Sequence, residues 1–317
     1  MRVKVVLFTA VSVSVALAAG VAPAHAAFPG QNGKLAFTSD RSGNYDIWTM
    51  SPSGTGLRNL TAGSSGSDDV ANWSPDGRQI VFESTTVSAT NPTGDQEVFV
   101  MNADGSGRRQ ITFNESDDGV PSWSPDGQRI VFHRWFGDFD ADLMTIRANG
   151  SGERNLTRSP GVLDRQGVWS PDGSQIAFSH GGDAGAGRGD IYTIRPDGTR
   201  LRALTSTAAD EEYPDWSPDG RRIAFNTDRD GQFEVYVMRS DGSCPTRMTY
   251  ENGGLPVWSP DGRKLSFTSD RTGDPEIYTM RADGSRQRNR TSSTGSQDAF
   301  SDWQPLDRHS RAEEDDD

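Results

Sequence analysis

The pentapeptide Trp-Ser-Pro-Asp-Gly decides the fold of this chain. It begins at Trp73, Trp123, Trp169, Trp216 and Trp258, and a shortened copy, Trp303-Gln304-Pro305, follows. The spacings are 50, 46, 47, 42 and 45 residues, which is the period of a four-stranded β-propeller blade. Proline sets φ at the second position of a turn, and glycine takes the left-handed conformation that closes it. Each pentapeptide therefore predicts a strand that ends in a tight hairpin.

Three more strands are predicted after each turn. The second strand is a short apolar run that ends in phenylalanine, at 35–37, 80–82, 130–132, 176–178, 223–225 and 265–267. The third strand opens with an acid, namely Asp46, Glu97, Asp142, Asp190, Glu234 or Glu276. A short outer strand near a threonine completes the unit. Six second strands and six third strands predict an all-β fold, a six-bladed β-propeller of four-stranded blades over residues 27–305.

The two ends of the repeat predict how the ring closes. The first unit starts on a second strand at Asn32-Gly33, with no tryptophan strand before it, and the last unit has only the tryptophan strand of Trp303. We expect this C-terminal strand to complete the first blade, because closure removes the exposed sheet edges. Residues 306–317, which end in Glu-Glu-Asp-Asp-Asp, have the composition of a disordered acidic tail.

The N-terminal residues 1–26 have the features of a signal peptide. Arg2 and Lys4 precede the apolar run Val5–Val21, and Ala24-His25-Ala26 matches a cleavage site, so we expect Ala27 to begin a secreted or periplasmic protein. The alternative is a retained membrane anchor. Cys244 is the one cysteine and cannot form an internal disulfide. The net charge of −13 argues against a nucleic-acid partner, whose phosphates would be repelled.

The repeat resembles the WD40-like repeat of the TolB β-propeller family. The shared features are the Trp-Ser-Pro-Asp-Gly turn, the phenylalanine-ending second strand, the acid that opens the third strand and the Asp-Gly and Leu-Thr pairs further on. The resemblance implies an extracytoplasmic propeller that binds partners. TolB carries an α/β domain before its propeller. We expect none here, because about five residues separate the predicted cleavage site from the first strand.

Sixfold repetition separates structural residues from functional ones. A residue present in every blade serves the blade, so we assign structural roles to the tryptophans, to the aspartate of each turn and to the acids of the third strands. Function is expected where the repeat breaks, or where repeated residues meet at the axis of the ring.

One acidic position repeats at the predicted mouth of the central channel. Five residues before the tryptophan lie Asp68, Asp118, Asp164, Glu211 and Asp298, and Gly253 takes this position in the remaining repeat. Converging carboxylates suit Ca²⁺ or another divalent cation, so the sequence predicts a metal site at the channel mouth. The alternative is that each acid orders its own loop as an Asx-type turn.

The loops between second and third strands break the repeat in consecutive blades. The second blade carries an insertion at 85–95, the third carries His133, Arg134, Trp135 and Phe136, and the fourth carries His180 before a glycine-rich stretch. Aromatic side chains beside polar groups favour recognition of a peptide, a protein or a sugar. We therefore predict a binding surface there. The alternative is ordinary loop variation, with the aromatic rings folded onto their own blade.

Two functional hypotheses follow. The first is a monomeric, non-enzymatic scaffold that binds an envelope or extracellular protein, a peptide or a glycan. The second is a metal-dependent polysaccharide lyase or hydrolase, with His133 or His180 as base. No arrangement of serine, histidine and aspartate indicates a catalytic triad, and no catalytic residue is assigned.

Overall fold

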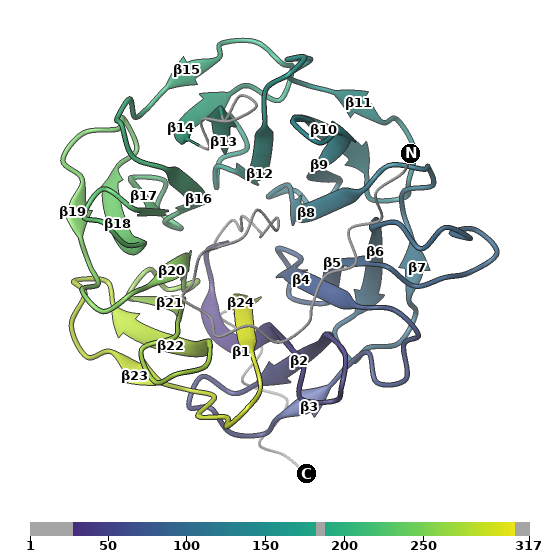
Figure 1. The fold of residues 1–317 in the computed structure, drawn as a ribbon, viewed down its shortest axis with the longest axis horizontal. Coiled ribbons are helices and arrows are strands. Elements are labelled where there is room, and N and C mark those ends of the chain that lie inside the picture. Colours follow the sequence, from purple (N-terminus) through teal and green to yellow (C-terminus); the bar gives the residue numbers. More distant parts are fainter. Residues whose placement is uncertain (1–27, 182–187, 308–317) are drawn as a thin grey trace.

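The computed structural model describes residues 28–181 and 188–307. The predicted signal peptide and most of the acidic tail lie outside these residues. The described residues form 24 strands in six four-stranded antiparallel sheets arranged as a ring (Figure 1), so the predicted six-bladed propeller is confirmed.

Each blade uses its four strands in the same order from the axis outward. The inner strands are β24 (Asp298–Leu306), β4 (Asp68–Trp73), β8 (Asp118–Trp123), β12 (Asp164–Trp169), β16 (Glu211–Trp216) and β20 (Gly254–Trp258). The second strands are β1 (Gln31–Ser39), β5 (Gln79–Ser84), β9 (Arg129–Gly137), β13 (Ile176–Gly181), β17 (Arg222–Thr227) and β21 (Lys264–Ser269). The third strands are β2 (Asp46–Met50), β6 (Glu97–Asn102), β10 (Asp140–Arg147), β14 (Gly189–Ile194), β18 (Glu234–Arg239) and β22 (Glu276–Arg281). The outer strands are β3 (Arg58–Asn59), β7 (Arg109–Gln110), β11 (Arg154–Asn155), β15 (Arg202–Ala203), β19 (Thr246–Arg247) and β23 (Arg288–Asn289).

The ring is closed by the last strand, as predicted. β24 pairs with β1 in the first blade, with Leu35 opposite Trp303 and Gln31 opposite Leu306. Trp303 is buried, and it packs in one apolar cluster with Leu35 and Val257, the latter from the sixth blade. The first and last strands of the propeller are therefore held together by backbone pairing and by apolar burial.

The core consists of side chains packed between neighbouring blades. The tryptophans of the pentapeptides and the phenylalanines of the second strands are almost completely buried. One cluster joins Ala36 and Ile47 of the first blade to Trp73 and Phe82 of the second. Because each blade is covered on both faces, its strands read as short apolar runs instead of strict alternation.

The repeated polar residues have the structural roles that repetition predicted. In each Ser-Pro-Asp-Gly turn the serine hydroxyl donates to the aspartate, at 2.6 Å for Ser74 and Asp76. Each third-strand acid accepts a hydrogen bond from the threonine after the outer strand, as in Thr61 to Asp46 at 3.0 Å. The same threonine oxygen accepts the N–H of Ile47 at 3.0 Å. This network ties the outer edge of the blade to its third strand.

Every inner strand contains a bulge with a residue in the left-handed conformation. These residues lie three positions before each tryptophan: Val70, Val120, Gln166, Tyr213, Leu255 and Phe300, with φ between 55° and 61°. This backbone conformation is unfavourable for residues other than glycine, asparagine and aspartate. Side chains of the preceding blade accept hydrogen bonds from the backbone of these residues. Glu83 accepts the N–H of Val120 at 2.8 Å, and Asn226 accepts the N–H of Leu255 at 3.3 Å. The bulge thus links adjacent blades.

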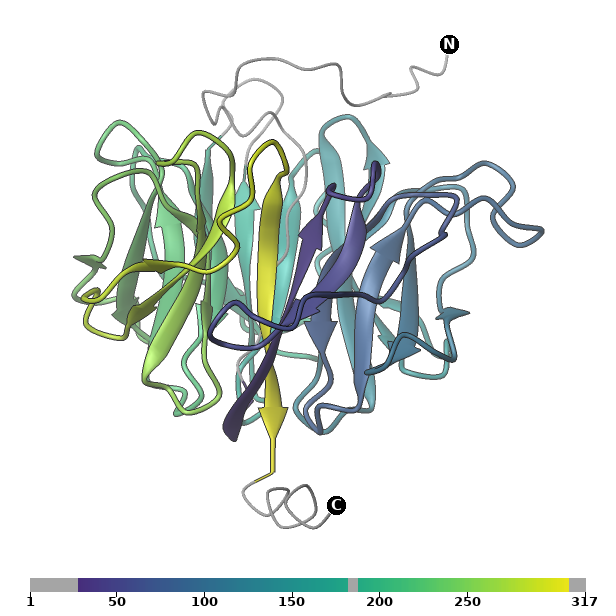
Figure 2. The same ribbon diagram turned by 90° about the horizontal axis from the view of Figure 1, so that it is seen from below.

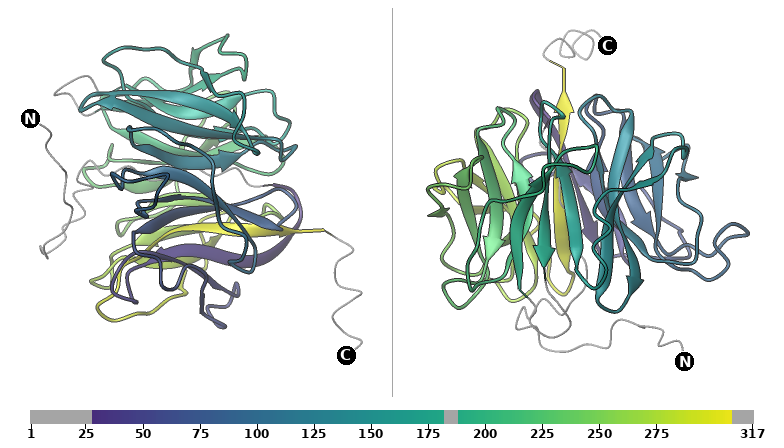
Figure 3. Two further views of the ribbon diagram at one scale, coloured as in Figure 1. Left: turned by 90° about the vertical axis from the view of Figure 1, so that its right-hand side faces the viewer. Right: turned by 90° about the horizontal axis from the view of Figure 1, so that it is seen from above.

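The ring has two distinct faces, which Figures 2 and 3 show from the side. The lower face carries the Ser-Pro-Asp-Gly turns, and β24 points toward it (Figure 2). The upper face carries the loops between second and third strands and the loops that enter the inner strands. Among the described residues, none belongs to a helix with the length and apolar character needed to cross a membrane.

The closing strand contributes a pH-dependent contact. Asp302 is buried, and its Oδ2 accepts the N–H of Trp73 in the second blade at 2.6 Å. Burial raises the pKa of Asp302 to about 8, against about 3.9 in an unfolded chain. The folded protein therefore keeps a proton that the unfolded chain loses between these values, so the contribution to stability falls as pH rises toward 8.

We expect Asp302→Asn to remove part of this pH dependence. By proton linkage the contribution of one such group reaches about 1.4 kcal/mol per pH unit. Urea unfolding of the wild-type chain between pH 5 and pH 9 should give a falling free energy of unfolding, and the variant should give a shallower fall. The exposed Asp104→Asn serves as the control. Identical slopes for the wild-type chain and Asp302→Asn would contradict this assignment.

Candidate functional site

The five predicted metal-ligand carboxylates lie at the start of the inner strands, on the upper face. All five are completely buried. Each contacts a basic side chain of its own blade: Asp68 pairs with Arg108, Asp118 with Arg134, Glu211 with Arg229 and Asp298 with Arg41, and Asp164 contacts the His180 ring. Four of the five carboxylates therefore have their charge balanced by an arginine of their own blade.

The partner cations come from different positions in the sequence. Arg41 and Arg229 lie in the short loop between second and third strands, whereas Arg134 lies on β9 itself and Arg108 immediately precedes β7. All four stack on aromatic rings of their blade. Three different positions of the repeat thus supply a guanidinium to the buried acid of their own blade.

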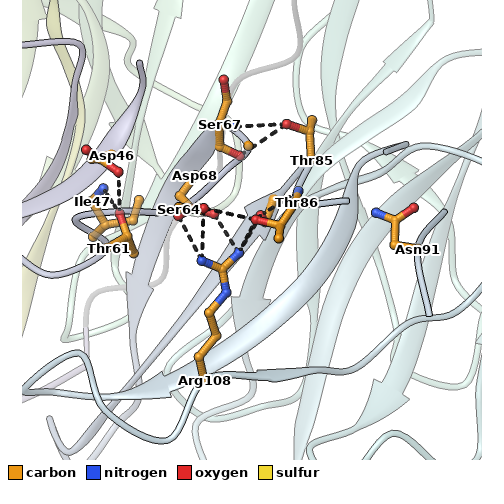
Figure 4. A network of polar contacts seen from close by, with 12 residues as sticks. Asp46, Ile47, Thr61, Ser64, Ser67, Asp68, Thr85, Thr86, Asn91 and Arg108 are labelled. Atoms are coloured by element: carbon orange, nitrogen blue, oxygen red, sulfur yellow. Dashed lines mark hydrogen bonds and ion pairs between the residues drawn. The ribbon is translucent and has the colours of Figure 1, made fainter. Parts of the chain in front are cut away.

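Arg108 shows the arrangement most fully (Figure 4). Its two Nη atoms bind the two oxygens of Asp68 at 2.8 and 2.9 Å. The same guanidinium donates to the hydroxyls of Ser64, Ser84 and Thr86 at 2.6–3.2 Å. Its Cζ lies 4.8 Å from the ring centroid of Phe99. Burial raises the pKa of Asp68, and Arg108 lowers it in part.

The structure does not bring the five carboxylates together. In the described part of the chain, no group of three or more histidine, cysteine, aspartate or glutamate side chains could hold a metal ion. Each acid instead contacts a basic side chain of its own blade, which is an arginine for Asp68, Asp118, Glu211 and Asp298 and His180 for Asp164. The metal site at the channel mouth stays a prediction.

We expect chelator treatment to leave the stability unchanged. Four of these carboxylates are already paired with an arginine, so little charge repulsion remains for a divalent ion to relieve. Thermal unfolding with and without a chelator should give the same midpoint, and dialysed protein should contain no stoichiometric divalent metal. A lower midpoint with chelator, restored by added Ca²⁺, would contradict this expectation.

The sequence predicted an exposed loop at His133 and Arg134, but the structure places both residues on strand β9. β9 continues to Gly137, so His133 pairs with Leu143 and Arg134 with Asp142 inside the sheet. His133 is fully buried, and burial lowers its pKa to about 3. Arg134 binds Asp118 at 2.6 Å and Glu153 at 2.7 Å. The longer hairpin buries both side chains instead of leaving them in solvent.

His180 also serves its own blade. Its Nδ1 lies 2.5 Å from Asp164, and its ring centroid lies 4.3 Å from that of Tyr192. It therefore replaces the stacked arginine of the other blades. The rest of the glycine-rich stretch, residues 182–187, lies outside the described residues.

Trp135 and Phe136 extend toward the tip of the β9–β10 hairpin. Trp135 is half-buried, with its ring edge-on to His133 and the guanidinium of Arg165 6.0 Å from its centroid. Phe136 is 52 % exposed, and Phe139 across the hairpin is 50 % exposed. The structure thus separates the predicted group: Phe136 is exposed, His133 and Arg134 are buried, and His180 contacts Asp164 and Tyr192 of its own blade.

Sequence reasoning missed Glu83 and Arg165. A side chain built at Gly119 would meet Glu83 Oε2 at 2.8 Å and the His133 ring at 3.3 Å, so these two groups flank Gly119. Burial, with Asp69 opposite, raises the pKa of Glu83 well above its usual range. Arg165 binds Glu212 at 3.3 Å. One sequence feature could have identified Arg165: the residue that follows each repeated acid differs from blade to blade.

Large apolar side chains are exposed on neighbouring loops of the second and third blades. We define the upper-face apolar patch as Val87, Phe113, Phe136 and Phe139, which are 50–61 % exposed. These loops are held together by Asp117, whose side chain accepts the N–H of Gln96 and whose carbonyl accepts that of Trp135. Exposed apolar groups held on ordered backbone are typical of interaction sites.

Comparisons with known proteins agree with this architecture. A family model described as the TolB beta propeller domain matches residues 4–182, 166–255 and 214–309. TolB from Acinetobacter baumannii is similar with a TM-score of 0.72 and 20 % identity, over 88 % of this chain and 68 % of that protein. A putative TolB from Agrobacterium tumefaciens gives 0.64 and 19 %, over 87 % and 99 %.

An enzyme shares the fold as well. An oligogalacturonate lyase in complex with manganese gives a TM-score of 0.54 and 17 % identity, over 80 % of this chain and 89 % of the lyase. A comparison with curated proteins found no match. At these identities the structural likeness shows the fold alone.

Proposed function

Since this chain belongs to the TolB β-propeller family, we propose that it is a non-enzymatic scaffold that binds a protein or peptide outside the cytoplasm. Residues 1–26 would direct its export. The observation that carries the proposal is the upper-face apolar patch, which projects from the ordered loops of two neighbouring blades. A rigid ring with a few exposed aromatic side chains suits an interface with a small number of anchor residues.

The patch is a break in the repeat, which supports a role other than folding. At the position equivalent to Phe113, the first, third, fourth, fifth and sixth blades have alanine, arginine, serine, tyrosine and serine. The hairpin with Phe136 and Phe139 replaces the short Ser-Asp-Arg type of loop seen in the first, fifth and sixth blades. Loops of this kind, held by a rigid framework, commonly carry binding function.

The proposal predicts that Phe136→Ser with Phe139→Ser abolishes partner binding without unfolding the protein. Envelope and secreted fractions of the host would be captured on immobilised wild-type and variant chains and compared by quantitative mass spectrometry. The matched control is Leu57→Ser with Leu201→Ser, because these exposed leucines precede the outer strands of other blades. A partner retained equally by all three chains would reject the patch as its binding surface.

A metal-dependent lyase or hydrolase is the second candidate. The buried Glu83 and His133, which flank Gly119 near the upper ends of their strands, favour it. Both ring nitrogens of His133 lack a hydrogen-bond partner among the described residues. Assays on acidic polysaccharides with added Ca²⁺ or Mn²⁺ test this candidate, with His133→Ala as the variant. Turnover that disappears in the variant would favour the enzyme over the scaffold.

A further inference from the structure

A second region with binding features lies on the lower face, away from the proposed partner surface. A cavity of about 630 Å³ opens among the Ser-Pro-Asp-Gly turns of the fifth and sixth blades and the segment 29–32. A cavity of about 480 Å³ adjoins it and shares Asp219 and Arg222 with it. We define the lower basic cluster as Arg221, Arg222, Arg239 and Arg263, which line these two cavities.

The cluster is particular to these two blades. The two residues after the turn are Arg-Arg in the fifth blade and Arg-Lys in the sixth, but Arg-Gln, Gln-Arg and Ser-Gln in blades two to four. Sixfold repetition therefore does not require Arg221, Arg222 and Arg263, whereas the position of Arg239 is also arginine in blades three, four and six. Their concentration is notable in a chain of net charge −13.

The arginines of the cluster are available to a ligand. Within the described residues, none of the four lies within ion-pair distance of a carboxylate. Arg221, Arg239 and Arg263 are exposed, and Arg222 stacks on Trp258 at 4.3 Å. Three carboxylates lie beside the cluster: Asp219 accepts from Ser217, Asp261 from Ser259 and Asp241 from Ser243. Each also attracts arginines of the cluster electrostatically without a close ion pair, so the four arginines exceed the acids beside them by one charge.

The closing strand ends at this cavity. Gln31, which lines it, pairs with Leu306, the last residue of β24. Gly30, also in the lining, lies so close that a side chain there would meet the Leu306 carbonyl at 2.8 Å. Figure 2 shows β24 directed to the lower face. The chain therefore leaves the propeller at the rim of the cavity.

The sequence beyond this point is strongly acidic. Residues 307–317 contain six acids and two arginines, and the last five residues are Glu-Glu-Asp-Asp-Asp. Eleven residues reach up to about 36 Å when extended, so the acidic run can cross to the fifth blade. The overall negative charge repels this run from most of the protein, and the lower basic cluster attracts it.

We propose that the lower basic cluster is a binding site for a carboxylate-rich peptide, and that the chain's own residues 313–317 occupy it. Guanidinium groups pair with carboxylates in a bidentate geometry, which favours them over lysine for this task. Tethering gives the segment an effective concentration in the millimolar range, so weak ion pairs suffice for occupancy. An external acidic peptide must displace the segment in order to bind.

The experiment measures binding of a fluorescently labelled peptide with the sequence of residues 312–317 by anisotropy. We expect the full chain to bind it weakly. A full chain with Glu313→Gln, Glu314→Gln, Asp315→Asn, Asp316→Asn and Asp317→Asn is expected to bind it about tenfold more tightly, because the tethered competitor is removed. The affinity of that variant should fall steeply with added salt.

Two triple substitutions, made in the chain with the neutralised segment, separate a specific site from general attraction. Arg221→Gln, Arg239→Gln and Arg263→Gln should weaken peptide binding at least about tenfold. These side chains are exposed, so folding should change little, and thermal unfolding checks this. The matched control, Arg78→Gln, Arg129→Gln and Arg147→Gln, removes equal charge from blades two and three and should leave binding unchanged.

Three results would overturn the proposal. One is equal peptide affinity for the wild-type chain and the chain with the neutralised segment. The second is no measurable binding to either. The third is an equal loss in both triple variants, which would indicate general electrostatic attraction only. None of these results bears on the upper-face patch, since its test uses other variants and other ligands.

Discussion

A chain that stops after Ser301 is expected not to fold. The truncation removes most of β24, and with it the pairing that joins Leu35 to Trp303 and Gln31 to Leu306. The second strand β1 would then present unpaired backbone groups, and the first and sixth blades would lose the buried Trp303 between them. An open propeller with such an edge is prone to aggregate. Circular dichroism and size-exclusion chromatography measure the outcome.

Smaller changes to the closing strand allow its contribution to the free energy of unfolding to be measured. Trp303→Ala keeps the strand but removes a side chain that is 2 % exposed, at a cost of about 3–5 kcal/mol in the free energy of unfolding. A chain that ends at Asp307 keeps β24 whole and should unfold at the wild-type midpoint. A cooperative transition at that midpoint in the chain that stops after Ser301 would show that closure does not stabilise the ring.

Loss of the Arg134 guanidinium should lower the free energy of unfolding by an amount similar to that of Trp303→Ala. Arg134 joins two acids: Asp118, whose side chain is fully buried, and Glu153, whose side chain is 38 % exposed. Arg134→Ala leaves the Asp118 charge buried without its partner, and breaking a buried pair in this way costs about 3–5 kcal/mol. Burial already raises the pKa of Asp118, against the lowering effect of Arg134. Urea unfolding measures the change.

Two companion variants identify the cause. Arg134→Ala combined with Asp118→Asn should recover part of the loss, because the uncompensated charge is gone. Glu153→Gln should cost less than about 1 kcal/mol, as exposed ion pairs do. If the double variant were no more stable than Arg134→Ala alone, lost stacking on Phe132 would be the cause instead of the buried charge.

The role of the acids five residues before the tryptophans could be predicted only in part from the sequence. Their repetition predicted a common role and left two interpretations open, a shared metal site or separate ordering of each loop. The sequence could not decide between them, because the partner cations come from positions as different as those of Arg41, Arg108 and Arg134. Only the folded blade brings these guanidinium groups to equivalent places.

The histidine and aromatic residues of the third blade make a similar point. Their break from the repeat predicted a binding surface on this hairpin, and Phe136 near its tip is exposed. Whether a residue lies on a loop or within a strand depends on where pairing stops, and β9 pairs as far as Gly137. His133 is consequently buried, and the exposed surface extends to Val87 and Phe113 of the second blade.

By itself the sequence determined the number of blades, the order of their strands and the closure of the ring. It could do so because turn chemistry and apolar periodicity are local, and because six copies of one unit leave little ambiguity. Only the tertiary structure decided the left-handed bulges at residues such as Val70 and Val120. Nothing in a valine predicts that conformation; neighbouring-blade side chains such as Glu83 hold it by binding the freed N–H. Contacts between blades, which no single repeat encodes, hold these bulges in place.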